Sequence, residues 1–481
     1  MSTHKSLIKA TLLFSVLSIL QPAANFLLLP VYTRFFGTEN FGLLSILNNI
    51  SAFFSILSGL NIAASIMAFY KNYKSEAEVQ RFISSVITFS FYTNLAILLI
   101  FCVWSNGFSG IMFHQKVEFY PNVFYAVFFG LFSNAGLAYL NLLKFQKQLT
   151  RYTVLTIIQF LAILVLQYLF IVILGRGLTG AMEAKAVTTI LIMAIVFFLL
   201  RKHMFRPIPF RTDIYPQLRY AIYTVPTAFI GWIGLYSDRT VIERFVHDNM
   251  FTLGQYSLVA TICALIDIGI IALNSAFQPY LFDTFVEGDK RQTTSYYKMF
   301  LAASILIVSG FILLGSNMQF MVKNKGLADS LIMIPLMGSG YVFSGLATVY
   351  GLRITFSKKA SYYMYISSSA VAINLVLNFL LISSLGIYGI IVAGIVSKFF
   401  MCITMIYFAE KCAPSNIWKL LLMITIISFC IIAATWLLYY SGFISLIVAV
   451  VLQMLGNSLL IVRFIKIGSI RALFIKKNNI D

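Results

Sequence analysis

Apolar runs about as long as a membrane is thick dominate this sequence and limit the folds open to it. A helix rises 1.5 Å per residue, so about 20 mostly apolar residues cross the hydrocarbon core of a bilayer. We count fourteen such runs, and no stretch between them is long enough for a soluble domain. The predicted spans are 8–30, 42–69, 82–104, 119–142, 152–174, 178–200, 220–237, 252–280, 297–316, 328–350, 361–383, 386–409, 417–438 and 443–463. The sequence therefore predicts an all-α polytopic membrane protein.

Composition and motifs exclude most other classes of protein. Hydrophobic residues make up 60% of the 481 residues and charged residues 11%, whereas soluble domains carry about 25% charged residues. Five cysteines are scattered through apolar segments, and the histidines His4, His114, His203 and His247 lie in loops or tails. Neither a metal site nor a disulfide framework is indicated. Because nucleotide-binding and hydrolase motifs are also missing, we expect no enzyme and no cofactor.

The basic residues indicate which way the chain crosses the membrane. The formal net charge is +19, and 26 of the 35 Lys and Arg residues fall in the N-terminus, the even-numbered loops and the C-terminal tail. The odd-numbered loops hold only 7 of these 35 basic residues. Because loops rich in Lys and Arg stay in the cytoplasm, both termini are predicted to be cytoplasmic. No small-x-small cleavage site follows the basic start, so the first run is expected to remain as a span.

Three short patterns recur in the same order at offsets of 209 to 212 residues. They pair Arg34–Ser45 with Arg244–Ser257, Lys147–Tyr152 with Lys358–Tyr363, and Gly177–Gly180 with Gly386–Gly389. We predict two six-helix lobes related by a parallel repeat, an arrangement in which transporters hold substrate between lobes and alternate its access. The predicted domains are an N-lobe at 1–210, a C-lobe at 211–412, and two additional helices with a basic cytoplasmic tail at 413–481.

The segment around the first loop carries a family resemblance. Pro30-Val31-Tyr32-Thr33-Arg34-Phe35-Phe36-Gly37, followed by Phe41-Gly42, resembles the first-helix signature of Wzx-type polysaccharide flippases. These belong to the superfamily that also contains MATE drug exporters and the lipid II flippase MurJ. The start of span six at Gly177-x-x-Gly180 and the passage from Asp238-Arg239 to Gly254-x-Tyr256 are also similar, and the resemblance covers about 1–412.

This resemblance implies a function, a location and partners. The implied activity is export of an undecaprenyl-pyrophosphate-linked oligosaccharide from the cytoplasmic to the periplasmic leaflet of the bacterial inner membrane. It would serve O-antigen (lipopolysaccharide), capsule or exopolysaccharide assembly and would work by alternating access through a cationic central cavity. The implied partners are the lipid-linked substrate, membrane lipids and polysaccharide polymerase machinery, with no nucleic acid.

Ionisable residues inside spans are costly and usually face such a cavity. Lys398 lies near the middle of span twelve and Lys185 about seven residues into span six. We predict that both bind the anionic substrate; the alternatives are a structural acidic partner for Lys398 and snorkelling to the outer interface for Lys185. Asp267, in the middle of span eight, either couples transport to H⁺ or Na⁺ or forms a salt bridge with one of these lysines. Glu183 is a weaker candidate for the same role.

Further polar residues are candidates for substrate binding or gating. Arg34 and the Asp238-Arg239 pair lie at the periplasmic ends of spans one and seven. They form either a periplasmic gate that closes by ion pairing, with Arg34 also in reach of substrate, or ordinary interfacial charges. Asn374 and Asn378 share one face of span eleven and bond either sugar hydroxyls or a neighbouring helix.

Two other transport functions stay open, namely MATE-type cation-coupled multidrug export and lipid II flipping. An exporter of organic cations requires an acidic or aromatic cavity, whereas two intramembrane lysines favour an anionic substrate. The arginine set expected in the cavity of lipid II flippases is not apparent. A periplasmic glycan polymerase is disfavoured because no outer loop exceeds about 15 residues.

Overall fold

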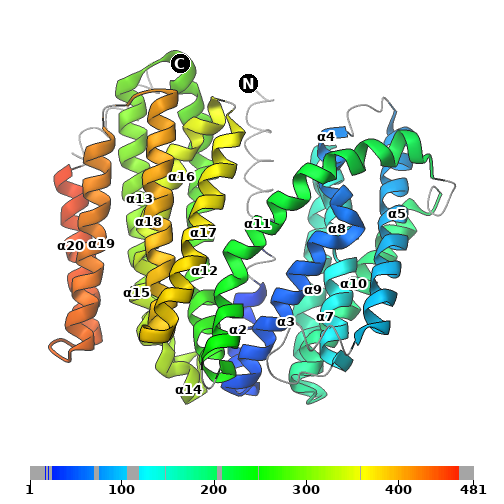
Figure 1. Cartoon of the computed structure of the whole chain (residues 1–481), viewed down its shortest axis with the longest axis horizontal. Helices are drawn as coiled ribbons and strands as arrows, with labels where there is room; N and C mark the ends of the chain where they lie inside the picture. Colours follow the sequence, from blue (N-terminus) through cyan, green and yellow to red (C-terminus); the bar gives the residue numbers. More distant parts are fainter. Residues whose placement is uncertain are drawn as a thin grey trace. The chain divides into compact units, whose positions relative to one another are not determined.

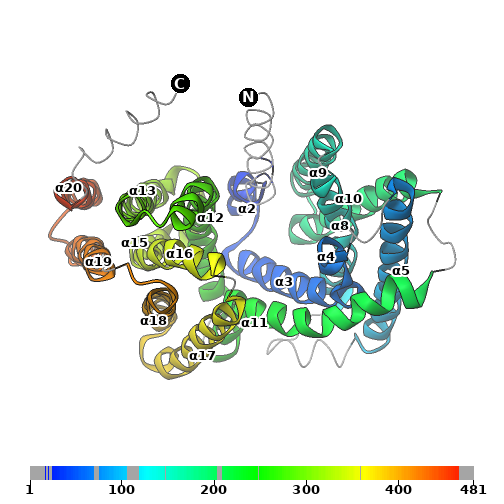
Figure 2. The same cartoon turned by 90° about the horizontal axis from the view of Figure 1, so that it is seen from above.

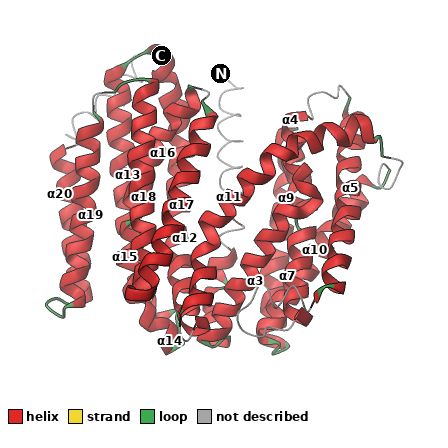
Figure 3. Cartoon of the chain, viewed as in Figure 1, coloured by secondary structure: helices red, strands yellow, loops and turns green. Residues whose placement is uncertain are grey.

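The computed structural model describes residues 24–69, 75–105, 119–146, 148–202, 208–246, 249–357, 359–415 and 417–464, together with Leu17 and Leu20. Within this part of the chain every regular element is a helix and no strand occurs (Figure 3). The all-α prediction is therefore confirmed. Most of the first predicted span, the four histidines and the basic C-terminal tail lie outside the described residues.

Eleven of the described helices are long and apolar enough to cross a membrane. They coincide with predicted spans two to six and eight to thirteen. Predicted span seven is a helix, α11 (Tyr215–Phe245), but tyrosine, threonine and glycine residues dilute its aliphatic side chains. Predicted span fourteen is a shorter apolar helix, α20 (Leu446–Phe464). A multi-pass membrane protein is thus confirmed, while the total of fourteen spans stays a prediction.

The chain divides into two compact units, residues 1–254 and 255–481, which we describe separately. Unit 1 holds these elements (Figure 1): α2 (Leu29–Phe35), α3 (Thr38–Leu57), η1 (Ser58–Ser65), α4 (Ile66–Phe69), α5 (Glu76–Val103), η3 (Phe119–Val123), α7 (Phe124–Phe132), α8 (Asn134–Phe145), α9 (Leu149–Tyr168), η4 (Leu169–Ile173), α10 (Gly177–Leu200), η5 (Phe210–Ile214) and α11.

Helix α5 shows how the sequence builds unit 1. Ser75 caps its first turn by accepting a 3.2 Å hydrogen bond from the Glu78 backbone N–H, and the Glu78 carboxylate accepts one from the Ser75 N–H in return. Further along, Phe82 and Val86 of α5 pack with Leu142 of α8 and Val196 of α10, all at most 1% exposed. These contacts form the core of unit 1.

Unit 2 begins within α12 (Asn249–Glu287). It continues through α13 (Lys290–Ser316), η6 (Met318–Phe320), α14 (Lys325–Ala328), η7 (Asp329–Met333), α15 (Ile334–Ser339), α16 (Tyr341–Phe356), α17 (Ala360–Leu385), α18 (Ile387–Cys412), α19 (Trp418–Tyr440) and α20. In Figures 1 and 2, α13, α16 and α18 run side by side, and α16 packs on both of the others.

The last two helices are fastened to unit 2 by a buried polar chain. Asn457 of α20 donates a 2.9 Å hydrogen bond to the Ser309 hydroxyl of α13 and accepts another of 2.9 Å from the Ser428 hydroxyl of α19. In lipid, such bonds between helices replace the hydrophobic driving force that water supplies to soluble bundles. The helices predicted as an appendage to the repeat therefore belong to the compact body of unit 2.

The compact units divide after Gly254, whereas the predicted lobes divide after residue 210. The difference is α11, which packs on α3 in unit 1. The Trp232 indole N–H donates a 3.2 Å hydrogen bond to the Asn49 carbonyl of α3, and the Asn49 side chain donates one of 3.4 Å to the Thr240 hydroxyl. The predicted lobe boundary follows the sequence repeat and stays a prediction.

Two glycines allow α3 and the start of α12 to cross in close contact. A Cβ on Gly42 would lie 2.3 Å from the Met250 carbonyl oxygen, and a Cβ on Gly254 would lie 2.1 Å from the Thr38 carbonyl oxygen. Real Cβ atoms do not approach so closely, so these backbones can cross at this distance only because both residues are glycine. The same two glycines are aligned in the predicted repeat.

We expect Gly254→Ala to destabilise unit 1, because the new methyl group would meet a backbone oxygen and the helices would have to separate. Overpacking of this kind costs about 1–3 kcal/mol. The thermal midpoint of the purified protein measures the loss. Gly231→Ala on α11 is the matched control, since an added Cβ there meets nothing within 4 Å. Equal midpoints for the two variants would contradict the close crossing.

Candidate functional site

Lys185 lies on α10 in the interior of unit 1, with 7% of its surface exposed. Its ammonium group donates a hydrogen bond to the side-chain oxygen of Asn48 on α3. The same group lies 5.6 Å from the centroid of the Phe129 ring on α7, a cation–π distance. The positive charge is thus turned into the unit, among neutral partners, and does not snorkel to the outer interface.

Glu183 lies two residues from Lys185 but is engaged elsewhere. Its carboxylate forms a 2.6 Å ion pair with Arg176 of the preceding loop and accepts a 3.4 Å hydrogen bond from the Tyr125 hydroxyl. The hydrogen bond and charge of Glu183 raise the pKa of Arg176, because both favour its protonated form. This pairing leaves Lys185 without a carboxylate partner among the described residues.

Lys398 and Asp267 lie together in unit 2. The Lys398 ammonium sits 4.6 Å from the centroid of the Tyr341 ring at the start of α16. Asp267 of α12 is near enough for the two charges to interact, but the groups are not in ion-pair contact in the described part of the chain. The sequence leaves either lysine open as a partner of Asp267, and within unit 2 it is the charge of Lys398 that interacts with Asp267.

Asn374 and Asn378 contact each other on α17. The Asn378 side-chain amide donates a 3.1 Å hydrogen bond to the Asn374 side-chain oxygen. Asn378 is 0% exposed and Asn374 is 7% exposed. Burial of both amides places them inside unit 2 in this conformation. Their binding of sugar hydroxyls stays a prediction.

Arg239 and Arg34 differ in how firmly they are held. The Arg239 guanidinium donates a 2.8 Å hydrogen bond to the Ser45 hydroxyl of α3 and a 2.9 Å bond to the Leu235 carbonyl. Arg34 is exposed at the end of α2, and its guanidinium lies 5.6 Å from the Phe35 ring. Arg239 therefore ties α11 to α3. A gate formed by Arg34 and the Asp238-Arg239 pair stays a prediction.

Comparisons with known proteins bear on these observations. The model of the family described as polysaccharide biosynthesis protein matches residues 7–285, which is more than half of the chain. The chain belongs to the polysaccharide biosynthesis protein family. A comparison with curated protein sequences gives no match. The resemblance to polysaccharide flippases is thereby confirmed at the level of the family.

Solved structures show the fold of this family member. It is similar to the lipid II flippase MurJ in an inward closed conformation, with a TM-score of 0.66 at 14% identity, over 96% of this chain and 100% of that one. It is also similar to a point mutant of the MATE transporter VcmN of Vibrio cholerae, with a TM-score of 0.58 at 13% identity, over 87% and 100%. A third similar structure is a MOP superfamily transporter from Pyrococcus furiosus, with a TM-score of 0.58 at 11% identity, over 86% of this chain and 96% of that one. At these identities the similarity shows the fold alone.

The structure also reveals a charged cluster in this family member that sequence analysis missed. Arg353 follows predicted span ten (328–350) and so falls in a predicted loop, but it lies in the last turn of α16 and is 8% exposed. Its Nη1 lies 3.8 Å from Glu410 Oε1 of α18, and its guanidinium carbon lies 5.5 Å from the Phe285 ring and 5.9 Å from the Tyr297 ring. Arg353 Nε and Nη1 donate no hydrogen bond to described protein groups.

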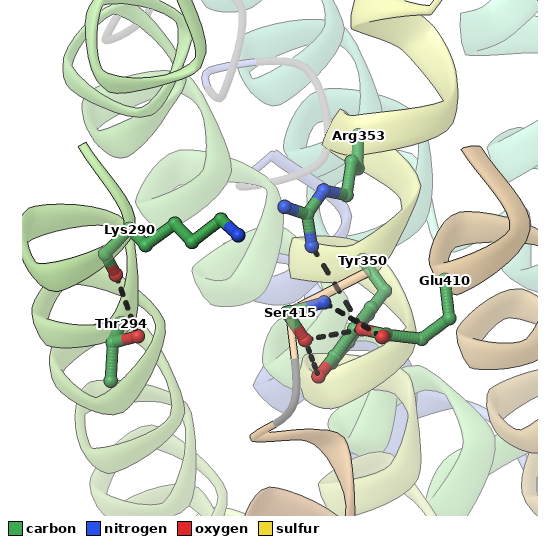
Figure 4. Close-up of polar contacts among 6 residues, drawn as sticks. All are labelled: Lys290, Thr294, Tyr350, Arg353, Glu410 and Ser415. Atoms are coloured by element: carbon green, nitrogen blue, oxygen red, sulfur yellow. Dashed lines mark hydrogen bonds and ion pairs between the residues drawn. The ribbon is translucent and has the colours of Figure 1, made fainter. Parts of the chain in front are cut away.

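Glu410 links this cluster to the segment before α19. Its Oε2 accepts a 2.8 Å hydrogen bond from the Ser415 backbone N–H, and its Oε1 accepts one from the Ser415 hydroxyl. The Tyr350 hydroxyl lies 3.4 Å from the same hydroxyl, and Figure 4 shows the Lys290 side chain extending toward the cluster. The sequence signal for this cluster was a pair of opposite charges, Arg353 just after predicted span ten and Glu410 just after predicted span twelve.

Proposed function

We propose that this protein is a flippase that moves undecaprenyl-pyrophosphate-linked oligosaccharides from the cytoplasmic to the periplasmic leaflet of the bacterial inner membrane by alternating access. Membership of the polysaccharide biosynthesis protein family supports a role in glycan assembly, and the fold shared with MurJ and MATE transporters supports transport. One observation carries the choice of an anionic substrate. Each unit contains an intramembrane lysine, Lys185 or Lys398, whose ammonium meets neutral groups and no carboxylate in contact among the described residues.

The chemistry of the substrate explains why such lysines would be kept. The polyprenyl tail can stay in the lipid, but the pyrophosphate is anionic and cannot cross hydrocarbon alone. A positive charge held in a low-dielectric environment without an opposite charge in direct contact is costly, so its retention needs a compensating benefit. An anionic head group would supply that contact, and a lysine ammonium binds phosphate as a point charge.

The rival functions differ from this proposal in the charge or the glycan of the substrate. An organic cation would be repelled by Lys185 and Lys398, which argues against a multidrug exporter. Lipid II remains the second candidate, because it also presents a pyrophosphate on a polyprenyl chain and because the MurJ similarity spans 96% of the chain, compared with 87% for the MATE transporter VcmN. We also propose that both termini are cytoplasmic, that the protein works with polysaccharide polymerase machinery, and that Asp267 couples transport to H⁺ or Na⁺.

Flipping in proteoliposomes tests this function. Purified protein is reconstituted with a fluorescent undecaprenyl-pyrophosphate glycan, and the fraction exposed in the outer leaflet is followed with an impermeant quencher. We expect the glycolipid to move between leaflets faster in these vesicles than in protein-free vesicles. Lipid II and a cationic dye are assayed in parallel vesicles. Transfer of lipid II alone, or efflux of the dye alone, would overturn the proposal in favour of that rival.

A further inference from the structure

The ammonium group of Lys185 is held at a tight joint between three helices of unit 1. Helix α7 packs on both α3 and α10. It crosses α3 so closely that a Cβ added to Gly130 would lie 2.4 Å from the Ser51 carbonyl oxygen. The Ser51 hydroxyl also donates a 3.0 Å hydrogen bond to the Ala126 carbonyl of α7. The side chains around Lys185 therefore stand on helices whose spacing is fixed by backbone contacts, which is what precise positioning requires.

Asn48 fixes the end of the Lys185 side chain within this joint. It lies one turn before Ser51 on α3, and its side-chain oxygen accepts the hydrogen bond from the ammonium. The Phe129 ring of α7 covers the same ammonium, 5.6 Å from its centroid. A lysine ammonium sits on a flexible four-carbon stem, so without such partners it would take many positions. Asn48 and Phe129 together determine where the charge lies.

The held ammonium lies close below the surface of unit 1. Lys185 as a whole is 7% exposed, but Asn48 and Phe129 are only half-buried. The charge is therefore separated from the outside by two partly exposed side chains. A small displacement of either one would let a bound group reach the ammonium while the helices stay in place.

The neutrality of Asn48 is the feature that needs an explanation. Buried charges are normally paired with an opposite charge, because an unpaired one is costly to desolvate. Aspartate has nearly the size and shape of asparagine and would give Lys185 an ion pair at this position. Helix α3 instead carries one acidic residue, Glu39, which is exposed in its first turn. Among the described residues no carboxylate contacts the Lys185 ammonium.

Arg239 is held on α3 in the same way. Its Nε donates a 2.8 Å hydrogen bond to the hydroxyl of Ser45, which precedes Asn48 by three residues. Residues three apart lie on one face of a helix. This face of α3 therefore holds two cations, one from α10 and one from α11, through neutral oxygens that leave both charges in place. Such a face attracts an anion.

We propose that Asn48 is a positioning residue for the transported anion. It holds the Lys185 ammonium with a neutral oxygen, so that the charge is kept for the phosphate of a lipid-linked substrate. The neutral partner also sets specificity, since a carboxylate at position 48 would occupy the ammonium and repel a phosphate. This inference rests on the proposed function, because it assigns a role in the same site.

Asn48→Asp tests the inference by exchanging an amide for a carboxylate of the same shape. We expect the thermal midpoint of the purified protein to stay equal or rise, because the carboxylate pairs with the Lys185 ammonium. We expect the initial rate of glycolipid movement in proteoliposomes to fall at least about tenfold, because the substrate must displace that carboxylate. A merely structural asparagine would not give this combination. An unchanged rate in the folded variant overturns the proposal.

Asn324→Asp is the matched control, because it makes the same chemical change elsewhere. Asn324 caps α14 in unit 2 by accepting a 3.2 Å hydrogen bond from the Leu327 N–H, and aspartate caps helices equally well. We expect its midpoint and its rate to match those of the wild type. An equal fall in rate for both variants would mean that any added carboxylate slows transport, and it would also overturn the role of Asn48.

Inorganic pyrophosphate separates a failure of this inference from a failure of the proposed function. Its effect on the thermal midpoint is measured in detergent at constant ionic strength, in a Lys398→Ala background that leaves Lys185 as the lysine inside a predicted span. We expect a rise of about 3 °C at a tenfold excess over the dissociation constant, and no rise once Asn48→Asp is added. Equal midpoint changes with and without Asn48→Asp overturn the proposal. No glycolipid enters this measurement, so a wild-type protein that does not flip counts against the proposed function alone.

Discussion

Lys398→Ala is expected to abolish flipping of the undecaprenyl-pyrophosphate glycan, while Lys398→Arg keeps part of it. Removing the charge that faces a desolvated anion costs about 2 kcal/mol or more, which corresponds to at least about a thirtyfold loss of transport. Arginine keeps the charge but spreads it over a planar group that does not fit the same space over the Tyr341 ring. The measurement is the initial rate at which the fluorescent glycolipid moves between leaflets in proteoliposomes.

Lys359→Ala is the matched control for this experiment. Lys359 also rests on an aromatic ring, 5.4 Å from the centroid of Tyr362, but it is exposed at the start of α17. We expect its loss to leave the flipping rate within about twofold of wild type, because an exposed charge interacts weakly with a substrate through water. Equal rates for wild type, Lys398→Ala and Lys398→Arg would remove Lys398 from the proposed site.

Lys185 separates a role in transport from a role in stability. Lys185→Met keeps most of the side-chain volume and removes a buried charge, so the desolvation cost disappears while the Asn48 oxygen loses its donor. These effects oppose each other, and we expect stability to stay within about 1 kcal/mol of wild type while flipping falls as for Lys398→Ala. A large loss of thermal stability with normal flipping of the folded fraction would make Lys185 a structural residue.

The fold could be predicted because its strongest signals are local in the sequence. The length of an apolar run is read without any knowledge of packing, and the predicted spans two to six and eight to thirteen coincide with apolar helices. Predicted span two is nevertheless interrupted, since Gly59, Leu60 and Asn61 have left-handed φ angles of +55°, +53° and +60°. This break escaped because Leu60 and Asn61 resemble any other residues of a span. Only the three-dimensional surroundings, with Asn94 bonded to the Gly59 N–H, stabilise that conformation.

The candidate site was less predictable for a similar reason. That Lys185 and Lys398 lie inside spans is visible in the sequence, but their neutral partners Asn48, Phe129 and Tyr341 come from other helices. Partner choice depends on which helices are neighbours, and a single sequence does not contain that information. Arg353 falls in a predicted loop because predicted span ten ends at residue 350, whereas in the structure it is buried against side chains of α12, α13 and α18.

Glu410→Gln is expected to cause the largest loss of stability of any single change considered in unit 2. The glutamine oxygen can still accept the hydrogen bond from the Ser415 N–H while its NH2 group donates to the Ser415 hydroxyl, but the Arg353 guanidinium then stays buried without a counter-charge. Breaking a buried pair by removing one partner costs about 3–5 kcal/mol, and we expect the lower end because the two side chains retain 10% and 16% exposure. Glu287→Gln is the control, since that carboxylate is exposed at the end of α12.

The double variant Arg353→Met/Glu410→Gln shows whether charge or packing is responsible. Methionine can fill space between the Phe285 and Tyr297 rings without a charge or unpaired N–H donors, so it removes the cost that Glu410→Gln exposes. We therefore expect the double variant to be more stable than Glu410→Gln alone, with a coupling energy of about 1–3 kcal/mol from a double-mutant cycle on chemical unfolding. Additive losses would mean that Glu410 acts through Ser415 and the start of α19, and that its charge contributes nothing at Arg353.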